Sequence, residues 1–191
     1  MLIMLKDEVA KAFKVVQDGG IILYPTDTIW GIGCDAANTE AVQKIYRLKQ
    51  RSETKSMIIL LDTDAKLASY VQEVPELAYN LIEYAENPLT LVMSGARNIS
   101  PALIAADGSI GIRVSGHPFC QGLIQRLRRP LVSTSANISG KPSPQYFSQI
   151  DQEIIDGVDY VVDIDQHSME IKNPSTIMRL EPDGKFEFLR R

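Results

Sequence analysis

The sequence predicts a single α+β domain, that is a mixed α/β fold, from its size, its composition and the order of its patterns. The 191 residues, 45% of them apolar and 23% charged, suit one domain with a hydrophobic core. Short apolar runs typical of buried strands mix with stretches of helical spacing, without strict alternation. This mixture favours a twisted mixed sheet with flanking helices. No internal repeat or long linker divides the chain, so we expect residues 1–191 to form one domain.

Helices are predicted where apolar residues recur three or four positions apart. Val9 and Ala12 show this spacing, and Gly19 is a stop signal for the helix that carries them. Asn38 or Thr39 would cap the next helix. The predicted helices cover residues 6–18, 39–48, 64–71, 75–86, 119–128 and 146–155.

Strands are predicted where a short apolar run ends in turn residues. The run IILYP ends at Pro25, and the glycines of the GIG that follows at 31–33 are typical of a turn. The order of the strands does not follow from these patterns. The predicted strands cover residues 21–25, 57–61, 89–93, 109–114, 130–136, 158–164, 175–180 and 185–190.

Composition narrows the class of protein and its compartment. The net charge of −4 argues against a protein whose main task is binding bulk nucleic acid. No apolar run approaches the roughly 20 residues of a membrane helix, and the opening MLIML is too short for a signal peptide. We therefore expect a cytoplasmic protein with no membrane partner. Cys34 and Cys120 are expected to be free thiols, with a disulfide between them as the less favoured alternative.

Several known catalytic patterns are absent from the sequence. It contains no phosphate loop, no G-x-G-x-x-G, no H-E-x-x-H and no cysteine cluster. The chain has 2 histidines, His117 and His167, and we interpret both as surface or loop residues. The basic run RLRRP at 126–130 is interpreted as helix-end charge, and a nucleic-acid role is the minority interpretation.

Small polar residues and cations at strand ends remain as candidates. Thr26, Asp27 and Thr28 follow the first strand in YPTDTIWGIGCDA, which alone indicates a turn. Arg113 interrupts the strand SIGIRV, and a cation there must face solvent or an anionic partner such as a substrate carboxylate. The hydroxyl and amide groups of STSANISGKPSP, at 133–144, indicate either caps and turns or a polar ligand site.

A cluster of cations in YRLKQRSETK precedes the strand at 57–61. It comprises Arg47, Lys49, Arg51 and Lys55. Its charge alone favours a solvated helix end, where cations stabilise the helix dipole. The alternative is a phosphate clamp, because Arg51 and Lys55 fall in a loop at the sheet edge.

Together these segments resemble the YrdC family, the threonylcarbamoyl-AMP synthases of tRNA modification. The matching segments follow the family's order over nearly the whole chain: YPTDTIWGIGCDA, Lys49-Gln50-Arg51, NPLTLVM, SIGIRV, STSANISGKPSP and NPSTIM. The resemblance implies a YrdC-like twisted mixed β-sheet with flanking helices around a large, positively lined cavity. The YciO-like branch lacks the full K-x-R and S-x-N motifs, and this chain keeps both.

The resemblance also implies the reaction. L-threonine, bicarbonate and ATP, with Mg²⁺, would give threonylcarbamoyl-AMP and pyrophosphate, and partner proteins would then transfer the threonylcarbamoyl group to tRNA. The nucleophile, a threonylcarbamate oxygen, is already anionic and needs no general base, so positioning and charge neutralisation would dominate.

The resemblance also implies roles for individual residues. Thr28, Arg113 and Ser133 would bind threonine, and Lys49 and Arg51 would be catalytic. No protein ligand to a metal is expected. The residues expected to bind ATP or the adenylate are Arg51, Lys55, Ser109, Ser135, Asn137, Ser143 and Arg190. As a catalytic carboxylate, Asp27 ranks below these residues, because an aspartate at a strand end is commonly a turn former.

The chain departs from the family pattern where Ser52, Ser56 and Ser115 replace prolines, which removes φ restraints near the proposed site. Two rival functions stay open. One is an RNA-binding module for tRNA or double-stranded RNA, which would include a weak tRNA contact. The other is a nucleotide-binding regulator without catalysis.

Overall fold

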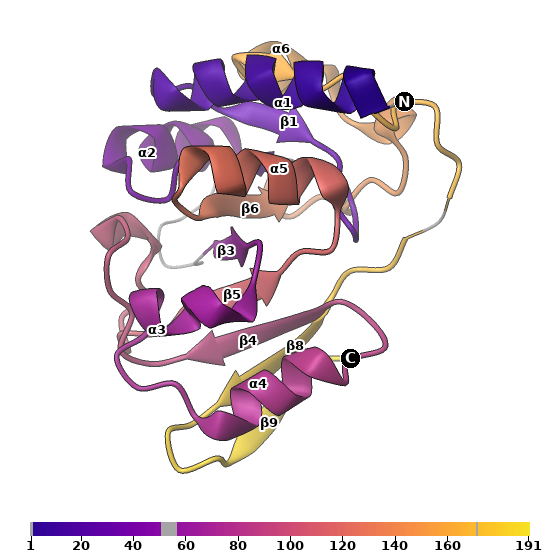
Figure 1. Ribbon diagram of the computed structural model, residues 1–191. Coiled ribbons are helices and arrows are strands. Elements are labelled where there is room, and N and C mark those ends of the chain that lie inside the picture. The colour runs from indigo at the N-terminus through magenta and orange to yellow at the C-terminus, as the bar shows by residue number, and fades with distance from the viewer. Residues whose placement is uncertain (1, 51–56, 171) are drawn as a thin grey trace.

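The computed structural model describes residues 2–50, 57–170 and 172–191, and these form one nine-stranded mixed sheet with helices around it (Figure 1). The strand order is β7-β1-β2-β6-β3-β5-β4-β8-β9. The pairs β1–β7, β3–β5 and β4–β8 are parallel, and the other neighbouring pairs are antiparallel. The predicted mixed α/β fold is therefore confirmed.

The strands of this sheet are short. They lie at Ile22–Tyr24 (β1), Gly31–Gly33 (β2), Ile58–Leu61 (β3), Leu89–Met93 (β4), Ile110–Val114 (β5), Leu131–Ser135 (β6), Tyr160–Val161 (β7), Thr176–Leu180 (β8) and Phe186–Arg190 (β9). The α-helices lie at Leu2–Gln17 (α1), Thr39–Leu48 (α2), Leu67–Tyr70 (α3), Glu76–Glu83 (α4), Pro118–Leu127 (α5) and Gln152–Gly157 (α6). Single 3₁₀ turns lie at Asp64–Lys66, Pro101–Leu103 and Phe147–Gln149.

Most predicted elements are confirmed within a few residues, and the exceptions have local causes. The single helix predicted at 146–155 is wrong, because Ile150 and Asp151 are extended and separate a 3₁₀ turn from α6. The strand predicted at 158–164 shortens to β7, since only Tyr160 and Val161 pair in register with residues of the three-residue β1. Asn38, not Thr39, caps α2, and its side chain accepts a hydrogen bond from the Ala41 amide.

The structure adds β2, which the sequence pattern indicates only as a turn. β2 has the sequence GIG and lies between β1 and β6. A Cβ atom on Gly33 would lie 2.1 Å from the Val132 carbonyl oxygen and 2.8 Å from the Tyr24 ring. Glycine in a strand marks such a close backbone approach, and it carries none of the β-branched side chains by which strands are predicted.

The described residues place hydrophobic cores on both faces of the sheet. α1 and α5 lie side by side at one end of it (Figure 1) and share a core with Tyr24, Leu60 and Leu131. α2, α3 and α4 pack on the other core, which includes Ile59 and Ile112. Both cysteines are buried free thiols, as predicted. In the described part of the chain, no helix combines the length and apolar character needed to cross a membrane.

The cover provided by α1 and α5 ends at β5, and this leaves room for a site. Leu60 lies under these helices, and its partner in the β3–β5 register is Arg113. Because register partners in a sheet share a face, Arg113 lies on the same face one strand further on. It lines a pocket there instead of a core.

Glu8 fastens α1 to the edge of the sheet. Its carboxylate accepts hydrogen bonds from the Lys11 ammonium at 2.8 Å, the Tyr160 hydroxyl at 2.6 Å and the Asp163 amide at 2.8 Å. Burial by itself raises the pKa of Glu8, but these hydrogen bonds outweigh it and hold the pKa below its ordinary value of 4.5.

Replacing Gly33 with alanine should destabilise the fold by about 3 kcal/mol, because the added methyl group meets backbone that cannot move aside. Urea unfolding measures the free energy. Gly116→Ala is the matched control, since a Cβ there meets nothing within 4 Å. Equal stability of both variants would contradict the close approach of β2 to β6.

Glu8→Gln should lower the free energy of unfolding by about 2 kcal/mol at pH 7. The folded pKa of Glu8 is depressed, so its stabilisation is present above pH 4.5 and is lost as the pH falls through the folded pKa. Urea unfolding from pH 7 to pH 3 should therefore show the gap between the two proteins closing. The exposed Glu86→Gln should show no such gap at any pH.

Candidate functional site

A pocket of about 200 Å³ lies on the same face of the sheet as α1 and α5, over the part that these helices leave uncovered. Its described lining comes from β2 to β6, β8 and β9, from the loop between β1 and β2, and from residues next to β3, β6 and β8. Predicted site residues that the structure brings together here are Thr28, Arg113, Ser133, Ser135, Ser143 and Arg190. The lining also includes Trp30, Thr90 and Ser175, to which the sequence assigns no role.

Other predicted residues lie elsewhere. Ser109 lines a neighbouring pocket of about 500 Å³, which shares Met57, Ile58, Thr90 and Ile177 with the first. Arg51 and Lys55, like Ser52 and Ser56, fall outside the described residues. The large, positively lined cavity stays a prediction. The described residues show two adjoining pockets, the first of which contains two arginines.

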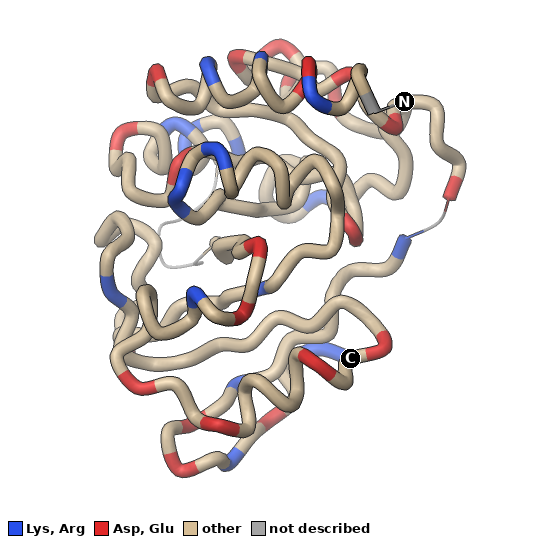
Figure 2. The backbone as a smooth tube through the Cα atoms, viewed as in Figure 1, with Lys and Arg blue, Asp and Glu red and all other residues tan. Residues whose placement is uncertain are grey.

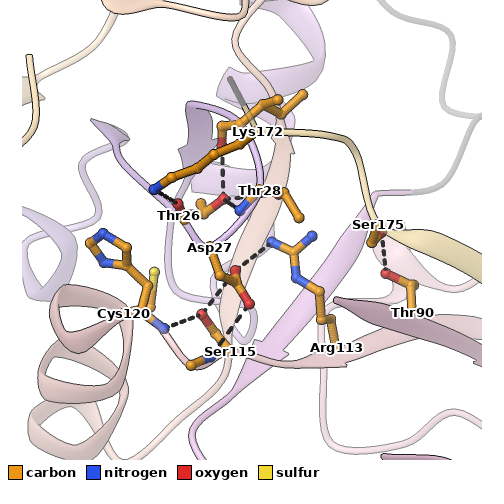
Figure 3. Close-up of polar contacts among 12 residues, drawn as sticks. Thr26, Asp27, Thr28, Thr90, Arg113, Ser115, Cys120, Lys172 and Ser175 are labelled. Atoms are coloured by element: carbon orange, nitrogen blue, oxygen red, sulfur yellow. Dashed lines mark hydrogen bonds and ion pairs between the residues drawn. The ribbon is translucent and has the colours of Figure 1, made fainter. Parts of the chain in front are cut away.

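Arg113 is the central cation of the first pocket. Its side chain is 4% exposed, and Nη2 lies 3.3 Å from Oδ1 of Asp27 (Figure 3). Its Nε is buried and has no hydrogen-bond partner among the described residues. A buried donor without an acceptor costs about 1–3 kcal/mol. Arg113 is therefore paired with Asp27 on one side, and its Nε is a donor left without an acceptor among the described residues.

Asp27 and Ser115 are hydrogen-bonded to each other behind the Arg113 guanidinium. The Ser115 hydroxyl donates to Oδ1 of Asp27 at 3.2 Å, and the Gly116 amide donates to Oδ2 at 3.4 Å. Ser115 is fully buried, and its amide donates to the Leu61 carbonyl at 2.9 Å, a bond that proline could not make. At this position hydrogen bonds supply the restraint that a proline ring would supply in the family pattern.

The turn at 26–29 presents the Thr28 hydroxyl to the pocket. Thr26 Oγ1 donates to the Ile29 carbonyl at 2.8 Å and accepts from the Thr28 amide at 3.0 Å. The two threonine hydroxyls lie 2.9 Å apart. Because the single Thr26 proton is used, Thr28 must be the donor between them. Thr28 therefore keeps only acceptor capacity for a ligand.

Lys49 holds the loop after β6 from beneath. It is 1% exposed, and its ammonium donates to the carbonyl oxygens of Ser135 and, at 2.6 Å, of Asn137. The Ser135 hydroxyl donates to the Asn137 side chain, whose amide donates to the Lys141 carbonyl at 2.6 Å. The K-x-R lysine and the S-x-N motif thus contact each other. The catalytic role expected of Lys49 stays a prediction.

Arg190 is the second arginine of the pocket. Its Nε and Nη2 donate to the Ser175 carbonyl at 3.1 and 2.8 Å, and the Ser175 hydroxyl lies 2.8 Å from that of the buried Thr90. In Figure 3 the Thr90–Ser175 pair lies on the other side of Arg113 from Asp27. Burial, and then repulsion by Arg113, lower the pKa of Arg190. A pocket with this charge favours an anion.

The Ser109 hydroxyl, in the second pocket, is hydrogen-bonded to a neighbouring side chain. Its hydroxyl donates to Asp107 at 2.6 Å, and Arg179 donates to the same carboxylate at 2.9 Å. These bonds lower the pKa of Asp107 to about 2. An ATP contact through Ser109 stays a prediction. The sequence analysis assigns no role to the pocket residues Thr90 and Ser175. Both are hydroxyl residues within or beside an apolar strand, and this pattern is the sequence signal that could have identified them.

The basic run at 126–130 behaves as a helix end. α5 ends at Leu127, and Arg128 is its C-cap, so the prediction for this run is confirmed. Arg126 lies 4.8 Å over the Phe13 ring, and Arg129 pairs with Asp35 at 2.5 Å. Figure 2 shows acidic and basic segments interspersed along the helices of this region. These internal contacts leave less of the run for RNA phosphates.

Comparison with known proteins shows the family of the chain. The Sua5/YciO/YrdC family model, described as Telomere recombination, matches residues 14–191. A Methanocaldococcus jannaschii relative is 37% identical over 171 residues, 89% of this chain and 79% of the relative. The threonylcarbamoyl-AMP synthase of Pseudoalteromonas translucida is 33% identical over 158 residues, 81% of this chain and 84% of the relative. P. abyssi Sua5 complexed with L-threonine matches with a TM-score of 0.81 and 26% identity, over 92% of this chain and 51% of that one.

Lys49→Met should lower the free energy of unfolding by about 2 kcal/mol, because the carbonyl oxygens of Ser135 and Asn137 lose a buried charged donor. Urea unfolding measures the loss. Lys141→Met in the same loop, where the lysine is 55% exposed, is the control and should change little. A Lys49 variant with unchanged stability would show that Lys49 does not support the loop.

Proposed function

The chain belongs to the Sua5/YciO/YrdC family, and from this membership we propose that it is a threonylcarbamoyl-AMP synthase. Its substrates are L-threonine, bicarbonate and ATP, and its products are threonylcarbamoyl-adenylate and pyrophosphate. Partner proteins transfer the threonylcarbamoyl group to tRNA. The observation that carries the proposal is the buried Arg113, whose Nε has no partner among the described residues and which lines the pocket with Thr28 and Ser133.

The seat for threonine follows from the donors and acceptors of these residues. The Arg113 guanidinium pairs with the carboxylate, as arginine does bidentately in many sites. The Thr28 hydroxyl, which retains only acceptor capacity, accepts from the amine or hydroxyl of threonine. Ser133, 6% exposed, lies across the pocket on β6 and can donate or accept.

ATP occupies the rest of the pocket and its neighbour. Arg190 supplies positive charge, with Ser135 and Ser143 on the lining. Ser109 belongs to the adjoining pocket, which is large enough for part of the nucleotide. By family resemblance, Arg51 and Lys55 contact the phosphates of ATP. The residues around Arg113 and Arg190 hold threonine and ATP on one face of the sheet.

The chemistry is a displacement at phosphorus. The neutral amine of threonine and bicarbonate condense to a carbamate with loss of water. An anionic carbamate oxygen then forms a bond to the α-phosphorus while the bond from that phosphorus to pyrophosphate breaks. The chain contributes position and positive charge, and no general base. Mg²⁺ supplies charge neutralisation on the phosphates. No group of three His, Cys, Asp or Glu in the described residues could hold a metal.

The direct test is release of pyrophosphate by the purified protein with ATP, Mg²⁺, bicarbonate and L-threonine. We expect release that depends on threonine and on bicarbonate, and a product with the mass of threonylcarbamoyl-AMP. ATP binding without threonine-dependent release would favour a nucleotide-binding regulator. Steeply salt-dependent RNA binding without release would favour the RNA-binding module.

Thr28→Val should raise KM for threonine about tenfold, because valine keeps the shape but removes one hydrogen bond to the substrate. KM for ATP should stay within about twofold, since the hydrogen bond concerns threonine only. Steady-state kinetics with each substrate varied in turn separates the two effects. An equal rise in both KM values would place Thr28 outside the threonine seat.

A further inference from the structure

Asp27 contacts Arg113 from behind and does not belong to the described lining of the pocket. Its carboxylate contacts Arg113 Nη2 at 3.3 Å, the Ser115 hydroxyl at 3.2 Å and the Gly116 amide at 3.4 Å. These groups all belong to the end of β5 and the residues that follow it. Asp27 therefore joins the first strand-end loop to the segment that carries Arg113.

These contacts differ from those of a turn former, the role that the sequence favours for Asp27. The turn at 26–29 is held by the Thr26 hydroxyl, which bonds to Thr28 and Ile29. The hydrogen bond from Ser115 to Asp27 instead spans 88 positions of the chain. The role of a turn former is thus taken by Thr26, and the Asp27 carboxylate serves Arg113.

The direction of the Arg113 guanidinium decides what it can bind. A guanidinium is a planar fork of five N–H groups, and it pairs with a carboxylate strongly only when fork and carboxylate face each other. Asp27 holds Nη2, while Nε has no partner among the described residues.

We propose that Asp27 is a positioning residue that turns the Arg113 guanidinium toward the carboxylate of the substrate, and so makes the site selective for carboxylate-bearing ligands. The inference rests on the proposed function, since threonine supplies that carboxylate.

The charge of Asp27 alone would have the opposite effect. Asp27 and a ligand carboxylate are both negative, so simple removal of the Asp27 charge would strengthen carboxylate binding. Loss of alignment would weaken it. The direction of the change therefore distinguishes positioning from a general field effect.

The test compares L-threonine with L-threoninol, in which a hydroxymethyl group replaces the carboxylate. Isothermal titration calorimetry gives Kd for both ligands with the wild-type protein and with Asp27→Asn. We expect the wild type to bind threonine at least about tenfold more tightly than threoninol, as a charged hydrogen-bonded pair allows. In Asp27→Asn this ratio should fall about fivefold. Any effect of Asp27 on the ligand ammonium is common to both ligands and cancels in the ratio.

Two further variants control for charge and for folding. Asp165→Asn removes a carboxylate that pairs with His117 at 3.2 Å, and it should leave the ratio unchanged. Ser115→Ala keeps the Asp27 charge but removes its hydroxyl donor, and the ratio should fall about twofold. Ser115→Ala carries the test alone if Asp27→Asn does not fold, as judged by circular dichroism.

The outcomes separate this inference from the proposed function. A ratio that stays the same or rises in Asp27→Asn, or in Ser115→Ala where that variant stands alone, overturns the positioning role even if pyrophosphate release depends on threonine. A wild-type protein that binds no threonine and releases no threonine-dependent pyrophosphate overturns the proposed function, and the positioning role with it.

Discussion

The pocket depends on the burial of one cation, the guanidinium of Arg113. A charge that is 4% exposed needs an anionic partner, because moving it out of water without one costs several kcal/mol. Asp27 supplies part of that compensation through a single contact at 3.3 Å, and Nε has none among the described residues. The free protein therefore holds an incompletely paired cation, and binding of an anion would complete its pairing.

The architecture of the sheet places this cation where a ligand can reach it. Leu60 on β3 is covered by α5, whereas Arg113, its register partner on β5, lies beyond that cover. The close packing of β2 against β6, which Gly33 permits, brings the 26–29 turn next to the pocket that Arg113 lines. The pocket lining thus combines side chains from segments that are far apart in the sequence.

Different residues support the pocket and line it. Lys49, Asp27 and Thr26 hold backbone or side chains in place from behind. Thr28 and Arg190 line the pocket itself. Such a division suits a reaction that depends on position and charge neutralisation, because every contacting group keeps its direction before the substrate arrives.

The sequence by itself determined the mixed α/β class, most strands and helices and the family resemblance, and it left Arg113 to face either solvent or an anion. The class and the elements follow from local apolar periodicity, the resemblance from six motifs in the family's order, and the alternatives for Arg113 from the cost of burying a charge. Only the tertiary structure decided the strand order, the existence of β2, the burial of Lys49 against the S-x-N loop and the fact that Thr26, and not Asp27, holds the 26–29 turn. Each of these depends on contacts between residues far apart in the chain, such as the 88 positions between Asp27 and Ser115, and no local pattern encodes such a contact.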